Sequence, residues 1–211
     1  MRIEEDEHTF ICGQTGTGKS IVAEVYLAGA KNVIKLDTKG EYYERKRDGK
    51  PPWRGLVEGR DYDVVFKLED IQYVKTPKCI YVPPAEEMND SYYDLLMKYV
   101  YERENTVLWI DEMMEVCPSA LKYPFHLKAL YTRGRSKKAT VWACTQRPSD
   151  IPAIAFGNST HFFIFAMQLP QDRDKLVKGT GMPQFYEQPI GHEFWYWKMG
   201  TPEPKLAILK L

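Results

Sequence analysis

The chain has 211 residues, of which 44% are hydrophobic and 27% are charged. This length and composition are typical of one globular domain with a buried core, and they exclude a disordered or fibrous protein. Lysine plus arginine and aspartate plus glutamate both number 29, so the net charge does not indicate a nucleic-acid partner. Any basic surface must therefore be local.

The cysteines and the N-terminus indicate the cellular compartment. Cys12, Cys79, Cys117 and Cys144 form no CxxC pair, so we expect them to be reduced and buried, with no metal site. The stretch MRIEEDEHTF is acidic where a secretion signal would be basic and then apolar, and no run reaches the roughly 18 apolar residues of a membrane span. These features predict a soluble, cytoplasmic protein.

Apolar runs alternate with helical stretches, which predicts an α/β fold with a mostly parallel sheet flanked by helices. The strands are expected at residues 9–12, 32–37, 63–68, 78–82, 107–111, 140–145 and 161–167. The helices are expected at residues 19–30, 86–102, 120–135 and 171–178. Residues 45–60 are predicted to be an exposed loop, and residues 192–211 an antiparallel hairpin. No linker is visible, so we expect one domain over residues 1–211.

Residues 13–20, GQTGTGKS, fit the phosphate-loop pattern G-x-x-x-x-G-K-[ST] behind an apolar strand and before a helix. The glycines let successive N–H groups point at phosphate oxygens, and the helix adds the positive end of its dipole. Lys19 would reach the outer phosphates of ATP, and the Ser20 hydroxyl would hold Mg²⁺. The alternative is a glycine-rich turn that matches by chance. The predicted nucleotide-binding residues are Gly13, Gln14, Thr15, Gly16, Thr17, Gly18, Lys19 and Ser20.

A second motif, NTVLWIDEMMEV, places two carboxylates at the end of an apolar strand. Asp111 would reach the Mg²⁺ through water, as P-loop enzymes require. Glu112 would polarise the water that attacks the γ-phosphate. The alternative is an acidic pair that only caps a helix.

A third motif, TVWACTQRPSDIP, ends an apolar strand in Thr145 and Gln146. Parallel α/β sheets gather their ligands at the carboxyl ends of their strands. Gln146 is therefore predicted to sense the γ-phosphate or to orient the water, although a glutamine that merely caps a turn fits the residue equally well.

Taken together, these motifs resemble the FtsK-HerA superfamily of P-loop DNA-pumping ATPases. The matching stretches are GQTGTGKS, LDTKGEY, WIDE, TRGRSKKATVWACTQRPSDIP and NSTHFFIF. The resemblance implies a RecA-like core in which the Gln146 strand lies between the phosphate-loop strand and the Asp111 strand. The residue His161 stands where many cellular relatives carry an arginine, so that arginine's role is not transferred.

Members of this superfamily act as rings, usually hexamers, so the resemblance also implies a catalytic arginine supplied by a neighbouring subunit. Such an arginine neutralises charge that develops on the γ-phosphate. The family pattern favours Arg135, with Arg133 and Arg173 as weaker candidates. The alternative for each is a solvated arginine at a helix end.

A local basic region supports a DNA partner. No acidic residue lies between Glu115 and Asp150. Repeated around a ring, this region would line a pore for a duplex backbone, without reading base sequence. Residues 122–128 are the first choice for a pore loop and residues 44–55 the second, although charge runs are usually solvated surface. The predicted DNA contacts are Lys122, Lys128, Lys137 and Lys138.

The compact motor resembles the genome packaging ATPases of tailless icosahedral double-stranded DNA viruses. This resemblance implies an ATP-driven packaging motor in the host cytoplasm or at a packaging vertex, with capsid vertex or membrane proteins as further partners. One alternative is a cellular or plasmid HerA/FtsK-like translocase. Others are a small-molecule kinase, a nucleotide switch, or an ATP-binding assembly factor at a membrane.

Overall fold

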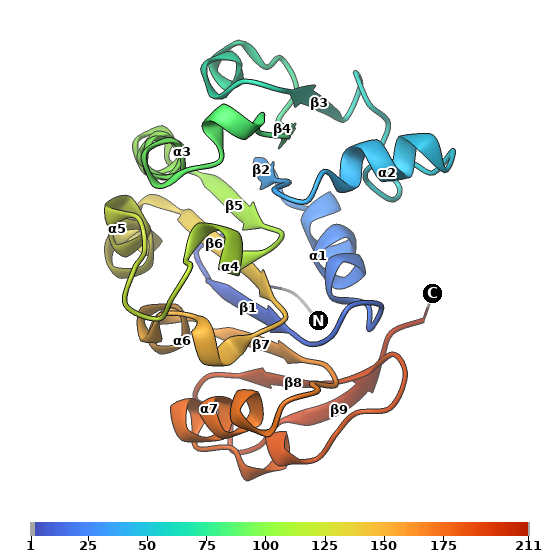
Figure 1. Ribbon diagram of the computed structural model, residues 1–211, viewed down its shortest axis with the longest axis vertical. Helices are drawn as coiled ribbons and strands as arrows, with labels where there is room; N and C mark the ends of the chain where they lie inside the picture. The colour runs from blue at the N-terminus through green and yellow to red at the C-terminus, as the bar shows by residue number, and fades with distance from the viewer. Residues whose placement is uncertain (1–2, 211) are drawn as a thin grey trace.

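The computed structural model describes residues 3–210, which form a nine-stranded sheet with helices on both faces (Figure 1). The strands are β1 (Thr9–Cys12), β2 (Val33–Leu36), β3 (Tyr62–Val65), β4 (Lys78–Tyr81), β5 (Thr106–Ile110), β6 (Ala139–Thr145), β7 (His161–Ile164), β8 (Glu193–Lys198) and β9 (Lys205–Ile208). Their order across the sheet is β3-β4-β2-β5-β6-β1-β7-β8-β9. The pairs from β3 to β7 are parallel, whereas the described pairs β7–β8 and β8–β9 are antiparallel. The predicted α/β fold and its terminal hairpin are confirmed.

Helices cover both faces of the sheet, as Figure 1 shows. They are α1 (Lys19–Ala28), α2 (Glu41–Arg47), α3 (Asp90–Arg103), α4 (Met113–Val116), α5 (Phe125–Arg133), α6 (Ala153–Asn158) and α7 (Pro170–Thr180). Leu96, Leu127 and Leu176 bring α3, α5 and α7 into one hydrophobic core, whereas Val22 and Leu27 bring α1 into the core on the other face. No helix between residues 3 and 210 is long and apolar enough to cross a bilayer.

The central strands are buried on both faces, which explains their near-continuous apolar sequences. In β5, Leu108 and Ile110 pack into the core beneath α3 and α5, while Val107 and Trp109 pack into the core beneath α1. The same alternation in β6 leaves no solvent-exposed face. Because β6 pairs with both β5 and β1, the Gln146 strand lies between the phosphate-loop strand and the Asp111 strand, as the resemblance implied.

The terminal hairpin extends this sheet. β8 pairs antiparallel with β7, and β9 forms the outer edge. Phe194 and Trp197 are buried in the two cores, whereas Trp195 and Tyr196 are half-buried. The aromatic residues of the hairpin therefore contribute to the cores, as expected from their density.

Three local expectations are wrong. Residues 45–60 are not simply an exposed loop, because α2 continues to Arg47 and Trp53 is fully buried, with its Nε1–H donating to the carbonyl of Glu24 at 3.2 Å. The helix expected at residues 120–135 begins only at Phe125, because residues 119–122 form a small antiparallel bridge that Pro124 follows. The short helices α2, α4 and α6 were missed, since four to seven residues are too few for a clear 3.6-residue period.

Candidate active site

Four neighbouring strands end in polar residues at the carboxyl edge of the sheet. β1 leads into the phosphate loop, β2 into residues 37–40, β5 into Asp111 and Glu112, and β6 into Gln146. Because these strands are parallel neighbours in the order β2-β5-β6-β1, their carboxyl ends meet. The Asp111 N–H also donates to the carbonyl of Leu36 at 3.3 Å, which keeps the ends of β2 and β5 level.

The phosphate loop has the backbone that its glycines predict. Gly13, Gly16 and Gly18 have φ values of 149°, 80° and 111°, which residues with a Cβ atom rarely adopt. The Gln14 N–H is tied to Ala166 beyond β7 at 2.9 Å. The Lys19 ammonium donates to the Gln14 carbonyl at 2.7 Å and so folds back over the loop. The loop is thus shaped for phosphates, with the Lys19 side chain already above it.

A methyl group at position 13 tests this geometry. In Gly13→Ala the new Cβ would lie 2.4 Å from the Cβ of Phe165, and φ would stay in a region that only glycine adopts readily. We expect the free energy of unfolding to fall by about 1–3 kcal/mol and nucleotide affinity to fall with it. Urea denaturation and calorimetric titration with ADP measure both quantities.

Gly157 provides the matched control, because it lies in α6 and no described residue outside that helix's own backbone is within 4 Å of an added Cβ. Gly157→Ala should leave stability unchanged or raise it by about 0.4–1 kcal/mol. Equal stability and equal ADP affinity in Gly13→Ala and the unmodified protein would contradict the geometry described for the loop.

Ser20 and Asp111 form the pair of oxygen ligands expected at a magnesium site. The Ser20 hydroxyl donates to Oδ1 of Asp111 at 3.3 Å, so a hydroxyl from the first turn of α1 and a carboxylate from the end of β5 face each other. Mg²⁺ prefers oxygen ligands and keeps several waters, and one or two protein oxygens beside substrate phosphates suffice. The residues therefore fit Mg²⁺ bound together with a nucleotide.

Buried charges surround Asp111. Burial raises the pKa of Asp111 above its usual value, and the nearby charge of Lys35 opposes that rise. Burial also opposes the charge of Lys35, but Asp111, Glu41 and Asp37 together hold its pKa above the ordinary range. The Lys35 ammonium contacts Glu41 at 2.8 Å and lies 4.4 Å from the centre of the Trp109 ring. A buried cation on β2 thus compensates the charge of the Asp111 carboxylate.

Glu112 and Gln146 are in direct contact. The Gln146 amide donates to Oε2 of Glu112 at 3.3 Å, and its own oxygen accepts from the Thr15 hydroxyl of the phosphate loop at 3.0 Å. The same Oε2 of Glu112 accepts from Lys39 at 2.9 Å. Within residues 3–210, Oε1 of Glu112 is buried without a hydrogen-bond partner. The buried Oε1 therefore has an unused acceptor position on a carboxylate that contacts Gln146.

The candidate arginines lie at different edges. Arg135 is in the turn just before β6, at the amino edge of the sheet, where its Nε–H donates to the carbonyl of Asp6 at 3.2 Å. Arg133 ends α5 nearby, with its guanidinium 5.8 Å from the centre of the Tyr101 ring. Arg173, in α7, donates to the Met167 carbonyl and lies at the carboxyl edge instead. Arg135 and Arg133 are therefore at the opposite edge from the phosphate loop of their own chain.

The four candidate DNA-contact lysines are also distributed between the carboxyl and amino edges of the sheet. Lys122 precedes α5 at the carboxyl edge and pairs with Asp90 of α3 at 2.6 Å. Lys137 and Lys138 precede β6 at the amino edge, where Lys137 pairs with Glu104. Lys128 is exposed on α5 between these two ends. Asp90 at the start of α3 and Glu104 just after its end supply carboxylates here, so this region is less positive than its basic sequence indicates.

Sequence reasoning missed several residues around the site. Lys39 was noticed only as part of LDTKGEY, and its contact with Glu112 joins residues 73 positions apart. The terminal hairpin also reaches the phosphate loop, where the His192 ring contacts the Thr17 carbonyl at 3.2 Å. Leu209 lies so close to Gly18 that a Cβ there would be 2.7 Å from it. No local signal in the sequence indicates these contacts, because they depend on the packing of distant segments.

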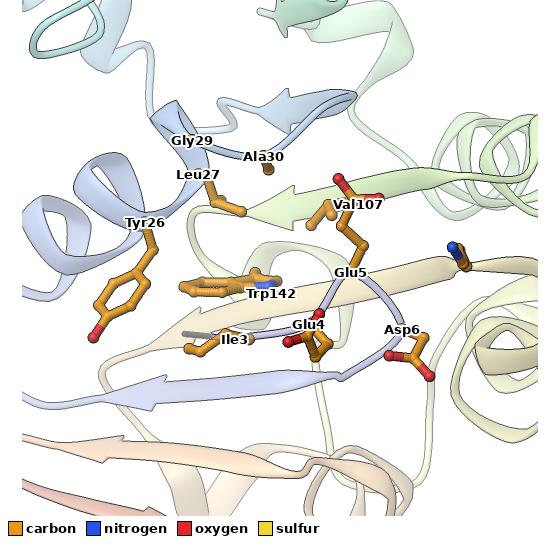
Figure 2. A pocket seen from close by; sticks show the side chains of 11 residues that line it. Ile3, Glu4, Glu5, Asp6, Tyr26, Leu27, Gly29, Ala30, Val107 and Trp142 are labelled. Carbon is orange, nitrogen blue, oxygen red and sulfur yellow. The ribbon is translucent and has the colours of Figure 1, made fainter. Parts of the chain in front are cut away.

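A second concave region lies at the amino edge and contains none of the predicted catalytic residues. The volume of this cavity is about 520 Å³. Figure 2 shows Trp142, Tyr26 and the acidic residues 4–6 among the side chains that line it. It lies beneath the C-terminal end of α1, whereas the phosphate loop lies at the opposite end of that helix. This hollow is therefore separate from the phosphate-binding machinery.

Comparison with known proteins identifies the family. Residues 3–151 match the family described as Helicase HerA, central domain. The chain belongs to the HerA central-domain family. No curated protein matches this HerA-family chain significantly.

Solved structures share the fold of this HerA-family chain. The genome packaging NTPase of Sulfolobus turreted icosahedral virus 2, in complex with sulfate, is 16% identical with a TM-score of 0.75, covering 99% of each chain. The DNA-packaging ATPase of Sulfolobus turreted icosahedral virus is 18% identical with a TM-score of 0.72, covering 95% of this chain and 96% of that one. VirB4 of Thermoanaerobacter pseudethanolicus is 12% identical with a TM-score of 0.60, covering 99% and 93%.

Family membership and the site geometry agree on the chemistry. The HerA-family domain binds a nucleotide and is an ATPase of the FtsK-HerA superfamily. A small-molecule kinase or a guanine-nucleotide switch is therefore not supported. The comparisons cover the family and the fold, whereas the roles of individual residues stay predictions.

Proposed function

We propose that this chain is an ATP-driven motor that moves double-stranded DNA, and that it packages a viral genome. The observation that carries the proposal is the likeness over the whole length of both chains to a genome packaging NTPase. The polar residues gathered at the carboxyl edge of the sheet, which are of the types that hydrolyse ATP in P-loop enzymes, also support the proposal. We place the motor in the cytoplasm of the host or at a packaging vertex, with capsid vertex or membrane proteins as its docking partners.

The proposed reaction assigns one task to each group at the carboxyl edge. Lys19 binds the outer phosphates, and Ser20 and Asp111 hold Mg²⁺, which neutralises phosphate charge when bound. Glu112 accepts the proton of the attacking water while Gln146 orients that water. The contact between Gln146 and Glu112 supports this division, because it places the amide beside the carboxylate that would take the proton.

A ring explains the position of Arg135. The residue is exposed at the amino edge, so the nucleotide that it can serve is that of another subunit. We propose a head-to-tail ring, most simply a hexamer, in which this edge faces the carboxyl edge of the next subunit. Lys137 and Lys138 would then lie near the subunit boundary, which makes Lys122 and Lys128 the better candidates for DNA contacts.

Stimulation of ATP hydrolysis by DNA tests this function. We expect long double-stranded DNA of unrelated sequences to raise the rate, and the rate to rise more steeply than protein concentration because rings must assemble. The measurement is steady-state hydrolysis over a protein series, with displacement of a triplex-forming strand as the translocation readout. An ATP hydrolysis rate that does not change with DNA and is proportional to protein concentration would contradict the proposed DNA motor.

A cellular or plasmid translocase of the HerA or FtsK type is the second candidate, which the likeness to VirB4 favours. It shares the chemistry and differs in the destination of the DNA. The two can be separated by testing whether the purified motor raises DNA uptake into empty capsids of its own virus. Triplex displacement without uptake would favour the translocase.

A further inference from the structure

Lys39 is the charged residue nearest the predicted base, and the catalytic scheme above gives it no task. Its ammonium lies 2.9 Å from Oε2 of Glu112, and its side chain is 39% exposed while that of Glu112 is 6% exposed. Lys39 is therefore the more exposed partner of a buried carboxylate.

The backbone that carries Lys39 is held firmly. The Asp37 carboxylate accepts the Glu41 N–H at 2.9 Å and the Tyr42 N–H at 2.7 Å, which fixes the start of α2. Glu41 in turn pairs with the buried Lys35 and with Arg45, which itself reaches Glu24 of α1. The turn is thus anchored to β2 and α1, while the partly exposed Lys39 side chain is held by its ion pair with Glu112.

Distance brings the γ-phosphate within reach of this ammonium. A base that takes a proton from the attacking water must lie one water away from the γ-phosphorus. Lys39 contacts that base directly, so a change in the rotamer of its long side chain can bring the ammonium to the phosphate oxygens. A phosphate group carries more negative charge than one carboxylate and offers three acceptor oxygens.

We propose that Lys39 is a γ-phosphate contact whose ammonium leaves Glu112 for the nucleotide when ATP binds. This inference rests on the ATP site proposed above. The exchange leaves Oε2 of Glu112 with one donor, Gln146, in place of the two donors Lys39 and Gln146. ADP lacks the γ-phosphate, so Lys39 stays on Glu112 when ADP is bound.

Separate affinities for ADP and for a non-hydrolysable ATP analogue test the inference. In Lys39→Met we expect the analogue to bind about 10-fold to 100-fold more weakly, because a charge-assisted hydrogen bond is lost, while ADP affinity changes less than about 2-fold. Lys39→Arg should restore most of the preference for the analogue. Calorimetric titration measures both nucleotides without relying on turnover, and thermal denaturation verifies that each variant is folded.

Lys46→Met is the matched control. Lys46 also pairs with a carboxylate at 2.9 Å, that of Glu58, and lies on α2 of the same segment, so its loss should leave both affinities unchanged. Equal weakening of both nucleotides by Lys39→Met, or no weakening, would overturn the γ-phosphate contact. If the unmodified protein bound neither nucleotide, the site itself would be wrong and the inference would fall with it.

Discussion

Glu112→Gln is expected to lower the rate of ATP hydrolysis by about 10²-fold to 10⁴-fold while ATP still binds. The amide keeps the shape of the carboxylate and can still accept from Lys39 and lie beside Gln146, so the architecture of the site is preserved. It cannot take a proton from water. The measurement combines steady-state hydrolysis, with and without DNA, and titration with ATP under conditions that prevent turnover.

Glu115→Gln is the control for this substitution. Glu115 is three residues further along the same segment, on α4, but its side chain is exposed instead of buried at the strand end. Glu115→Gln removes the same negative charge as Glu112→Gln, but it should hydrolyse ATP at the rate of the unmodified protein. Near-normal hydrolysis by Glu112→Gln would remove Glu112 from the mechanism and leave the attacking water to another group.

Arg135→Ala is expected to reduce hydrolysis by about 10³-fold or more if the residue acts on a neighbouring subunit's nucleotide. Its guanidinium lies at the edge opposite its own phosphate loop. The substitution should therefore lower the hydrolysis rate of assembled rings and not that of single subunits. Mixing Arg135→Ala subunits with Lys19→Ala subunits should restore part of the rate. In such mixed rings some intact phosphate loops face intact arginines.

Two further variants sharpen this experiment. Arg47→Ala removes a highly exposed arginine from the end of α2 and should leave the rate unchanged, while Arg133→Ala compares the neighbouring candidate directly. Rings must be verified by sedimentation before rates are compared. If verified mixed rings stay inactive, the arginine that acts between subunits is not Arg135, and a loss confined to Arg133→Ala would reassign the role.

Contiguous stretches of sequence were sufficient to predict the chemistry of the candidate site. The positive φ values at Gly13, Gly16 and Gly18 follow from residues that stand side by side in the chain, and an apolar run that ends in Asp111 and Glu112 needs no distant partner to be recognised. The position of β6 between β1 and β5 was also predicted, although by resemblance to a family and not by periodicity.

Local signals were weakest where packing overrides composition. The basic, proline-containing stretch after α2 was predicted to be exposed, yet it contains the fully buried Trp53, because the indole fills space against α1 and β5 that no local pattern reveals. Likewise, Lys122 and Lys137 are close in a basic sequence but lie at opposite edges of the sheet, since α5 and the turn before β6 separate them.

The sequence alone was enough for the phosphate loop, the acidic pair and the fold class, because each depends on backbone preferences and apolar patterns within about ten neighbouring residues. Folding was needed to bring Lys39 onto Glu112 and His192 onto the phosphate loop, contacts that span 73 and 175 positions. Such contacts depend on which strands become neighbours and how their ends align. Strand pairing is a property of the whole sheet, so no single segment of the chain encodes it.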